Sequence, residues 1–287
     1  MDSEGVFTLK RSRILIIGLG LMGGSLALAL KGKCASLAGL DISTETCQIA
    51  LEQDIVDKAF TEPAQAFVDV DVVILATPVN LILDYLRDLP AYLDASKRYL
   101  VLDLGSTKLE INAAMERLPQ NVDAVGCHPI CGKESLSIRN AERTLYFGAP
   151  FLVTTNSKTS ELAMAFVCEL ASELGAKMSM IDAELHDAVL ANISHLPYLI
   201  STALAMATPA EIAPFVGPGF RSSSRLAGTS SSMMMSIIAS NRQNILSNLE
   251  KFTDELAYLT SVIADNDSEG LRAYLDSGRE NYLKLKG

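Results

Sequence analysis

Short apolar runs alternate with longer segments of helical spacing through the first two-thirds of the chain. Runs with strand character occupy residues 13–18, 37–41, 71–77, 99–103, 122–126, 151–154 and 177–181. Segments with helical character occupy residues 21–31, 44–53, 81–89, 108–118 and 160–174. Because the strands are apolar along their whole length, the pattern predicts an α/β fold, a parallel sheet that helices cover on both faces.

The alternation stops in the last third of the chain. Residues 184–208 predict one long helix, which Pro197 should kink because its ring removes a helical hydrogen bond. Residues 209–229 are rich in Pro, Gly and Ser, which indicates a connection. We therefore expect two domains, a sheet domain over residues 1–182 and an all-helical domain over residues 183–287.

Beyond that connection, apolar residues recur at alternating spacings of four and three. This apolar stripe consists of Ile245, Leu249, Phe252, Leu256, Leu259 and Ile263. The spacing places them on one face of a helix, and a further helix is predicted over residues 271–285. A solvated helix does not carry so regular an apolar face, so we expect a homodimer through these C-terminal helices. Packing within one subunit is the alternative.

The composition is that of a folded, acidic protein. Of the 287 residues, 49% are hydrophobic, which excludes intrinsic disorder and fibrous repeats. Lysine and arginine number 24 against 34 aspartate and glutamate residues, which gives a net charge of −10. No nucleic-acid partner is expected, because neutralising phosphates needs a surplus of cations. An anionic small-molecule ligand would need a locally positive pocket.

Two features imitate other classes of protein. Cys127, His128 and Cys131 lie close together, but no second group of Cys and His completes a tetrahedral shell, so no metal is expected. Residues 14–30 carry no charge and imitate a signal peptide or a membrane span. Four glycines within them favour a buried strand, turn and helix instead. We expect a cytoplasmic protein with no membrane partner.

The segment after the first strand has the pattern of a dinucleotide-binding turn. Gly18, Gly20 and Gly23 form G-x-G-x-x-G between a predicted strand and a predicted helix, with Leu21 and Met22 inside the motif. The first glycine permits a tight turn, and the second lets the backbone approach a pyrophosphate. The third allows the helix to pack on the sheet. Glycines that pack without any ligand are the alternative.

Other residues at the ends of predicted strands point to the same edge of the sheet. Asp41 ends the second strand 23 residues after Gly18, where a carboxylate can accept hydrogen bonds from the adenosine ribose. No arginine follows it closely, and Glu45 would repel a 2′-phosphate, so NAD is favoured over NADP. Thr77 and Pro78 follow another strand at the edge where ligands bind, although a plain strand-to-helix turn would suit the same residues.

Hydride transfer from an alcohol needs a group that handles the hydroxyl proton. His128 follows a predicted strand on a loop, which favours a catalytic role. His195 lies inside an apolar predicted helix, where a satisfied core residue is the alternative. His186 has acidic neighbours and is expected at the surface. Ser106 follows another strand and is expected either to cap the next helix or to orient a substrate hydroxyl.

Arginines in the helical part are candidates for holding an anion. Between Ala188 and Asn241 the charged residues are Glu211, Arg221 and Arg225. Arginine offers a planar fork that matches a carboxylate. Arg225 is the favoured substrate ligand, and a surface position is the alternative.

Taken together, these residues resemble the prephenate/arogenate dehydrogenases, the oxidoreductases of tyrosine biosynthesis. The similar segments are GLGLMGGS at 18–25, ATPV at 76–79, DLGSTK at 103–108, GCHPICGKE at 126–134, ISHLP at 193–197 and GFRSSSRLAG at 219–228. Their order and spacing cover nearly the whole chain. The resemblance implies a Rossmann-type domain followed by an all-helical dimerisation domain.

The resemblance also implies an activity, the NAD-dependent oxidative decarboxylation of prephenate, with arogenate as the alternative substrate. It implies that His128 takes the proton of the ring C4 hydroxyl as hydride leaves C4, and that Ser106 orients this hydroxyl. Arg225 would hold the substrate carboxylate, and His195 would line the same pocket. Loss of CO2 and aromatisation of the ring would drive the reaction.

Two positions depart from the family pattern, and two other functions compete. Ser222 follows Arg221 where many members carry Asp, and this missing acid favours prephenate over arogenate, which carries an ammonium group. Met234 stands where many members have Trp. A β-hydroxyacid-type dehydrogenase would use a helix Lys that the segment around His195 lacks. An NAD-binding sensor without turnover would not need Ser106, His128 and Arg225 together.

Overall fold

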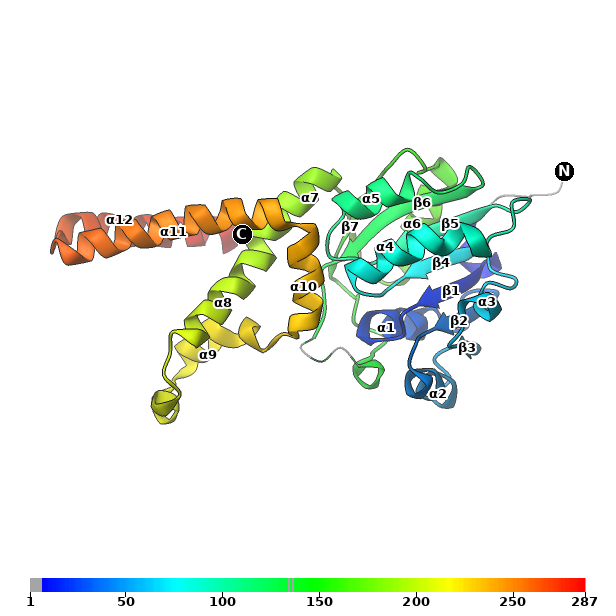
Figure 1. Ribbon diagram of the computed structural model, residues 1–287, viewed down its shortest axis with the longest axis horizontal. Coiled ribbons are helices and arrows are strands. Elements are labelled where there is room, and N and C mark those ends of the chain that lie inside the picture. The colour runs from blue at the N-terminus through cyan, green and yellow to red at the C-terminus, as the bar shows by residue number, and fades with distance from the viewer. Residues whose placement is uncertain (1–6, 134, 136, 287) are drawn as a thin grey trace.

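The computed structural model describes residues 7–133, 135 and 137–286, which form a sheet domain and a set of helices that projects from it (Figure 1). Within these residues the sheet has eight strands in the order β3-β2-β1-β4-β5-β6-β7-β8. The strands are β1 Arg13–Ile17, β2 Ser36–Leu40, β3 Lys58–Phe60, β4 Val72–Leu75, β5 Tyr99–Asp103, β6 Val122–Pro129, β7 Pro150–Thr154 and β8 Lys177–Met180. The helices around the sheet are α1 Leu21–Leu30, α2 Thr44–Glu52, α3 Pro63–Ala66, α4 Val79–Asp88, α5 Leu109–Met115 and α6 Glu161–Glu173. Glu134, the last residue of the GCHPICGKE motif, lies outside the described residues.

Strand β1 shows why the sheet is covered on both faces. Ile14 and Ile16 pack into one core with α1, α2 and α6, whereas Leu15 and Ile17 pack into a second core with α3, α4 and α5. Successive side chains of a strand point to opposite faces, so a continuous apolar run needs a core on each side. The predicted α/β fold is confirmed. The uncharged segment that imitated a membrane span is β1, a turn and α1.

The sheet is parallel, as predicted, except for one reversal of strand direction near an edge. Strand β7 pairs antiparallel with β6, with Gly126 opposite Thr154 and Pro129 opposite Phe151. A parallel pairing needs a crossover, usually a helix, and the described residues of the connection between these strands hold no helix beyond the 3₁₀ turn Ile138–Asn140. The connection also packs on α1, where the hydroxyl of Tyr146 donates to the carbonyl of Met22 at 2.7 Å. The short elements β3 and α3 were not predicted, because three or four residues show no periodicity.

The long helix predicted after the sheet is present but is not regular. It consists of α7 Ala183–Leu190, a π turn over Ala191–His195, and α8 Leu196–Met206. Pro197 lies in the first turn of α8, where its missing N–H is tolerated, and the irregularity falls on the residues before it. By length and composition alone, the stretch Ala183–Met206 is apolar enough to cross a membrane, and it is the single such helix in the described part of the chain.

The segment predicted as a connection is largely helical. It holds a 3₁₀ turn Ala210–Phe215, α9 Pro218–Ser224 and a 3₁₀ turn Arg225–Gly228. Pro209 and Gly217 are the residues that precede these helical turns, and Pro218 lies in the first turn of α9. Proline and glycine therefore mark helix boundaries here rather than an absence of helix.

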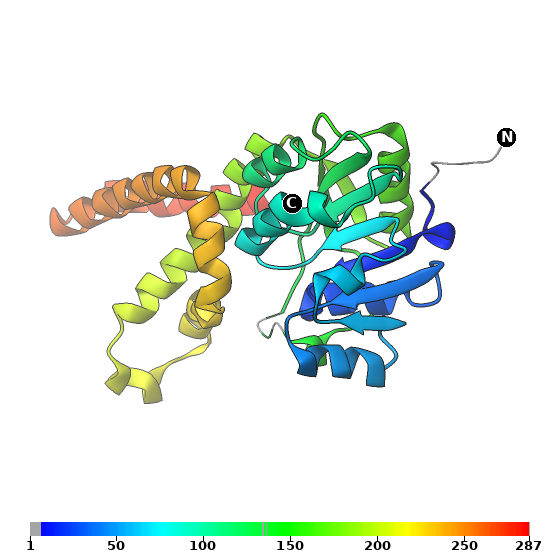
Figure 2. The same ribbon diagram turned by 45° about the vertical axis from the view of Figure 1, so that its right-hand side comes forward.

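The last three helices are α10 Ser231–Ser240, α11 Arg242–Ala264 and α12 Ser268–Lys286. Helices α11 and α12 form a hairpin that projects away from the sheet domain, as both views show (Figures 1 and 2). The apolar stripe changes its surroundings along α11. Ile245 is 2% exposed near the body of the molecule, whereas Leu256 is 48% and Ile263 is 56% exposed toward the tip.

Candidate active site

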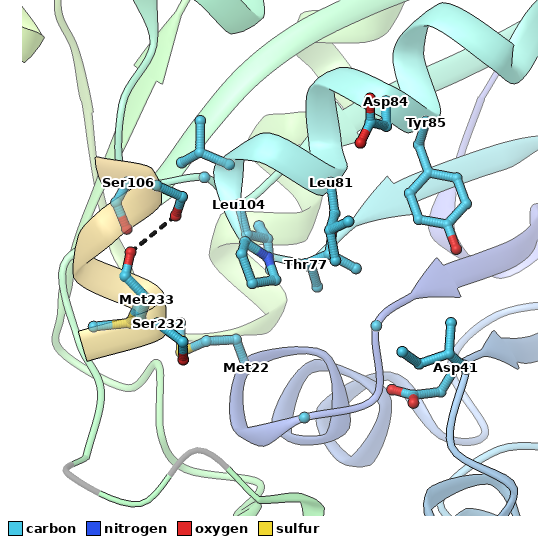
Figure 3. A pocket seen from close by; sticks show the side chains of 18 of the residues that line it. Met22, Asp41, Thr77, Leu81, Asp84, Tyr85, Leu104, Ser106, Ser232 and Met233 are labelled. Carbon is cyan, nitrogen blue, oxygen red and sulfur yellow. Dashed lines mark hydrogen bonds between the residues drawn. The ribbon is translucent and has the colours of Figure 1, made fainter. Parts of the chain in front are cut away.

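A pocket of about 540 Å³ lies between the carboxyl ends of the sheet strands and α10 (Figure 3). Eight residues singled out in the sequence line it, namely Gly18, Gly20, Leu21, Met22, Asp41, Thr77, Pro78 and Ser106. Helix α10 contributes Ser232, Met233, Ser236 and Ile237. Asp41 and Ser106 lie toward opposite ends of the pocket, with Thr77 between them (Figure 3). The pocket is therefore elongated and is bounded by both domains.

The glycine turn is shaped by close contacts that a side chain would prevent. Gly18 has a φ of 91°, and a Cβ there would lie 2.7 Å from Cγ2 of Thr77. A Cβ on Gly23 would lie 1.8 Å from the carbonyl oxygen of Gly18. Gly23 is not part of the pocket wall, so it lets α1 pack on the turn, whereas Gly18 and Gly20 face the pocket.

Asp41 follows β2 and is held in place by two backbone amides. Its carboxylate accepts hydrogen bonds from the amide of Leu19 at 2.8 Å and of Ser43 at 2.9 Å. A carboxylate offers about four acceptor positions, so two remain for ribose hydroxyls. Asp84 and Asp88 line the same pocket and add negative charge, which disfavours a 2′-phosphate.

The hydroxyl of Thr77 tests whether this pocket fits a nucleotide. Its Oγ1 is buried and has no hydrogen-bond partner, and no other described side chain holds such an atom. Burying an unpaired hydroxyl costs about 1–3 kcal/mol, so the site is built for a polar ligand group at that position. With the glycine turn and Asp41 on the same walls, the residues present fit a dinucleotide.

Ser106 is not the cap of the helix that follows it. The first amides of α5 donate instead to Asp187 of α7, Lys108 N–H at 2.7 Å and Leu109 N–H at 3.0 Å. Ser106 lines the pocket (Figure 3). The predicted capping role is therefore wrong, and the orientation of a substrate hydroxyl stays a prediction.

The neighbouring residues of the DLGSTK motif join the two domains. Thr107 Oγ1 lies 2.9 Å from Ser240 Oγ of α10. Lys108 forms a salt bridge with Asp103, and both side chains are 0% exposed. The motif thus holds a buried positive charge next to the strand end that carries His128.

His128 lies near the end of β6, and a second histidine is hydrogen-bonded to it. Its Nδ1 is 2.9 Å from Nε2 of His186, and Nδ1 of His186 is 2.7 Å from Oδ1 of Asp187. The prediction that His186 lies at the surface is wrong, because its side chain is 0% exposed. Helix α7 turns His186 and Asp187 inward against the sheet domain, while Glu184 on the same helix stays exposed.

Burial sets the ionisation of the two histidines predicted from the sequence. It lowers the pKa of His128 well below its ordinary value of 6.5, and the charge of Lys108 lowers it further. His128 is therefore neutral at pH 7 and ready to accept a proton. His195 lies in the π turn, and burial lowers its pKa to about 4. Its Nδ1 is 3.3 Å from Nδ2 of Asn241, so it is a partnered core residue outside the pocket walls.

Arg225 is not brought to this pocket by the single chain. It begins the 3₁₀ turn after α9, is exposed, and is absent from the pocket walls. Met234, which replaces the family's Trp, is 6% exposed and also lies outside the walls, where Met233 is found instead. Among the described residues, no group of three His, Cys, Asp or Glu side chains is arranged to hold a metal ion.

A Rossmann-type sheet, a glycine turn with an acid after the second strand, and a neutral histidine at the same sheet edge define a nucleotide-dependent dehydrogenase with a helical second domain. Two family models match the chain. "Prephenate dehydrogenase, nucleotide-binding domain" matches residues 26–180, and "Prephenate dehydrogenase, dimerization domain" matches residues 182–277. The chain belongs to the prephenate dehydrogenase family.

Individual relatives match nearly the full length of this chain. The prephenate dehydrogenase of Bacillus subtilis is 30% identical over 281 residues, which are 94% of this chain and 75% of the relative. The crystal structure of prephenate dehydrogenase from A. aeolicus in complex with hydroxyphenyl propionate and NAD+ has a TM-score of 0.86 at 28% identity, covering 97% of this chain and 99% of that one. The Synechocystis arogenate dehydrogenase has a TM-score of 0.78 at 27% identity, covering 95% and 99%.

Proposed function

We propose that the chain is an NAD-dependent prephenate dehydrogenase, which oxidises prephenate with loss of CO2 to 4-hydroxyphenylpyruvate. The observation that carries the proposal is the neutral His128 at the carboxyl end of β6, next to the strand end that leads to Ser106. Asp103 and Gly126 are paired in the sheet, so Ser106 and His128 follow adjacent strands at one edge. The curated relatives from Bacillus subtilis and Lactococcus lactis both carry the name prephenate dehydrogenase.

The pocket residues would hold NAD. Asp41 would accept ribose hydroxyls, the turn at Gly18 and Gly20 would face the pyrophosphate, and Thr77 Oγ1 would find its missing partner. Bound NAD supplies the hydride acceptor. The three carboxylates of the pocket favour NAD over NADP, because a 2′-phosphate would add negative charge beside them.

The protein's own residues would handle the substrate. His128 accepts the proton of the ring hydroxyl, and Ser106 orients that hydroxyl. Arg225 would hold the substrate carboxylate, because its guanidinium offers a planar fork that matches a carboxylate. His195 supports the same region from the core. Glu211 is the one acid between Ala188 and Asn241, which offers little to an ammonium group and favours prephenate over arogenate.

A homodimer accounts for the exposed apolar surface of the helical part. Large apolar side chains are exposed on both helices of the hairpin, namely Leu246, Leu256, Tyr258, Ile263, Leu275, Tyr282, Leu283 and Leu285. The stretch Ala183–Met206 lies within the residues matched by the dimerization-domain model, so its apolar composition suits a subunit interface. We place the division between the domains at residue 182, and the enzyme in the cytoplasm without a membrane partner.

Turnover of prephenate by the purified protein tests the proposal. With NAD and prephenate, absorbance at the NADH band should rise, and the rise should be slower with NADP or with arogenate. The β-hydroxyacid-type alternative predicts activity with simple 3-hydroxy acids instead, and these serve as the comparison substrates. If the protein binds NAD but does not turn over prephenate, the alternative of an NAD-binding sensor without catalytic activity is favoured.

A further inference from the structure

We propose that His186 and Asp187 are positioning residues, which hold His128 in the tautomer that leaves its Nε2 free to accept the substrate proton. The inference rests on the proposed function, in which His128 is the base. It concerns two residues that the sequence motifs did not include, one of which was expected at the surface.

The three side chains form one hydrogen-bonded row across the domain boundary. His128 of β6 contributes Nδ1, which lies 2.9 Å from Nε2 of His186 on α7. The other nitrogen of His186, Nδ1, lies 2.7 Å from Oδ1 of Asp187. His186 and Asp187 are 0% and 1% exposed, so water does not compete for these hydrogen bonds.

Asp187 decides the direction of every hydrogen bond in the row. Its Oδ1 accepts from the amide of Lys108, and its Oδ2 accepts from the amide of Leu109. Because both oxygens face backbone donors, the carboxylate acts as an acceptor and stands at the positive end of α5. Its contact with His186 is therefore a hydrogen bond donated by His186 Nδ1–H.

The tautomer of His128 follows from that direction. A neutral His186 that carries its proton on Nδ1 offers a lone pair at Nε2. His128 must then donate its Nδ1–H to that lone pair, and its own Nε2 carries no proton. The hydroxyl proton of the substrate can move to this nitrogen, as the O–H bond breaks and an N–H bond forms. No further proton needs to move along the row.

The row also supplies charge where the reaction creates it. Proton transfer turns His128 into a cation inside a buried region that already holds Lys108, which faces it from the start of α5, and His195, which faces it from the π turn. Asp103 is paired with Lys108, so Asp187 is the acid that the row connects to the new charge. A carboxylate that orients a catalytic histidine has this effect in Ser-His-Asp triads, where its replacement by the amide lowers kcat about 10⁴-fold.

Two isosteres of His186 separate positioning from packing. Asparagine places its polar group near the position of Nδ1, and can keep the contact with Asp187 but not the one with His128. Glutamine reaches the position of Nε2, where its carbonyl can accept from His128. The proposal expects His186→Asn to lower kcat about 10²-fold or more and His186→Gln to recover at least a tenth of the wild-type kcat. The opposite order would show that His186 serves the fold through Asp187, and would overturn the proposal.

Asp187→Asn should lower kcat about 10²-fold or more with little change in KM, because a donor facing His186 Nδ1 would reverse the row. Its matched control is Asp182→Asn, because Asp182 accepts the amides of Glu184 and Leu185 at the start of the same helix and lies outside the row. The control removes one negative charge from the same helix but keeps an N-cap, because asparagine caps a helix as well as aspartate does, so kcat should stay within about threefold of wild type. Equal losses of kcat in the two variants would mean that the charge on α7, and not the row, accounts for the effect of Asp187.

Two measurements keep a failure of the inference apart from a failure of the proposed function. The protein has three histidines, so ¹⁵N spectra of the cofactor-free wild type can report the protonated nitrogen of each ring. We expect Nδ1–H on both His128 and His186, and a proton on His128 Nε2 at neutral pH would overturn the proposal. The second measurement compares kcat of His128→Asn with kcat of the double variant that also carries His186→Leu. The two values should be equal, and a further loss in the double variant would contradict a role of His186 that acts through His128. If His128→Asn keeps the wild-type kcat, the role of His128 in the proposed function fails instead.

Discussion

The two parts of the molecule differ in how completely their apolar side chains are buried within one chain. In the sheet domain, two cores fill both faces of the sheet, and their members from β1, β4 and β5 are almost completely buried. In the helical part, few side chains are buried toward the tip of the projecting hairpin (Figure 2), and α11 and α12 expose leucine, isoleucine and tyrosine side chains. The sheet domain buries its apolar surface within one chain, whereas the helical part leaves apolar surface exposed, which the proposed homodimer would cover.

This difference explains how the site is divided. Every residue assigned to the cofactor lies in the sheet domain, on rigid strand ends that one chain holds in place. The groups that orient His128 come from α7, and α10 closes one wall of the pocket. Cofactor binding should therefore survive changes in the helical part that leave α10 in place, whereas turnover should not survive changes in α7.

The largest expected effect is on assembly. Replacing both Leu256 and Ile263 by glutamate should raise the dimer dissociation constant about 10³-fold or more, because each buried apolar side chain contributes about 1.5–3 kcal/mol and appears twice in a symmetric interface. Light scattering at micromolar concentration should then give a monomer mass. NAD affinity, measured by calorimetry, should change by less than about threefold.

The control for that variant places negative charge on the other side of the same helix. Lys251→Glu with Ser261→Glu changes two exposed residues that lie roughly 120° and 160° around the helix from the centre of the stripe. This protein should remain a dimer. A dimer that survives glutamate at Leu256 and Ile263 would mean that the stripe is not the interface.

The second effect concerns the chemical step. His128→Asn should lower kcat by about 10² or more, because it removes the general base, and the NAD affinity should stay unchanged because His128 is not on the pocket wall. Steady-state kinetics with prephenate and a separate NAD titration measure the two quantities. If the variant turns over at nearly the wild-type rate, His128 is not the general base and His195 becomes the candidate.

The third effect concerns the substrate. Arg225→Ala should raise KM for prephenate about 10- to 100-fold, because a hydrogen bond to a charged group contributes about 1.5–3 kcal/mol. Arg225→Lys should recover only part of the loss, because an ammonium group lacks the bidentate fork. If the alanine variant loses NAD affinity or unfolds while KM is unaltered, Arg225 is structural and the substrate site lies elsewhere.

The parts of the site that could be predicted from the sequence are those encoded within a few residues. The glycine turn, Asp41 and Thr77 each follow directly from a strand end, and parallel strands bring such ends to one edge of the sheet. The α/β fold followed from apolar periodicity for the same local reason. Ser106 and His128 were candidates for the same reason, and the family resemblance gave each of them a role. The sequence did not show which nitrogen of His128 is the base.

The parts that could not be predicted depend on contacts between distant segments. His186 and His128 are 58 residues apart, and a histidine beside an aspartate has the same local pattern on a surface as in a buried row. One signal was available in the sequence, since His186 precedes the apolar Leu190 by four residues, a spacing that places both on one face of the helix. Strand β7 was predicted, but its antiparallel direction was not, because strand direction depends on the path of the connection and not on the strand's own residues.

The smallest expected effect is a loss of stability in acid. The pKa of His195 is lowered by burial to about 4 in the folded protein, against an ordinary value of 6.5 in the unfolded chain. Above pH 6.5 both forms are neutral and the full stability is present. As the pH falls from 6.5 toward 4, the unfolded chain binds a proton that the folded protein does not, so stability falls by about 1.4 kcal/mol for each unit of pH in that window. His128 acts in the same direction, because burial also lowers its pKa.

Urea unfolding at pH 7.5 and pH 5.5 measures this loss, and His195→Gln isolates the share of His195. Glutamine stays neutral at both pH values, so the variant should lose about 1 kcal/mol less than the wild type between them. Because His195 lies in the π turn between α7 and α8, near-ultraviolet signals from tyrosines of the helical part should change at a higher pH than NAD binding does. Equal losses of stability in the two proteins would contradict the lowered pKa of His195. The lowered pKa agrees with the contact at 3.3 Å, because Nδ2 of Asn241 is a donor and gives a protonated Nδ1 of His195 no acceptor.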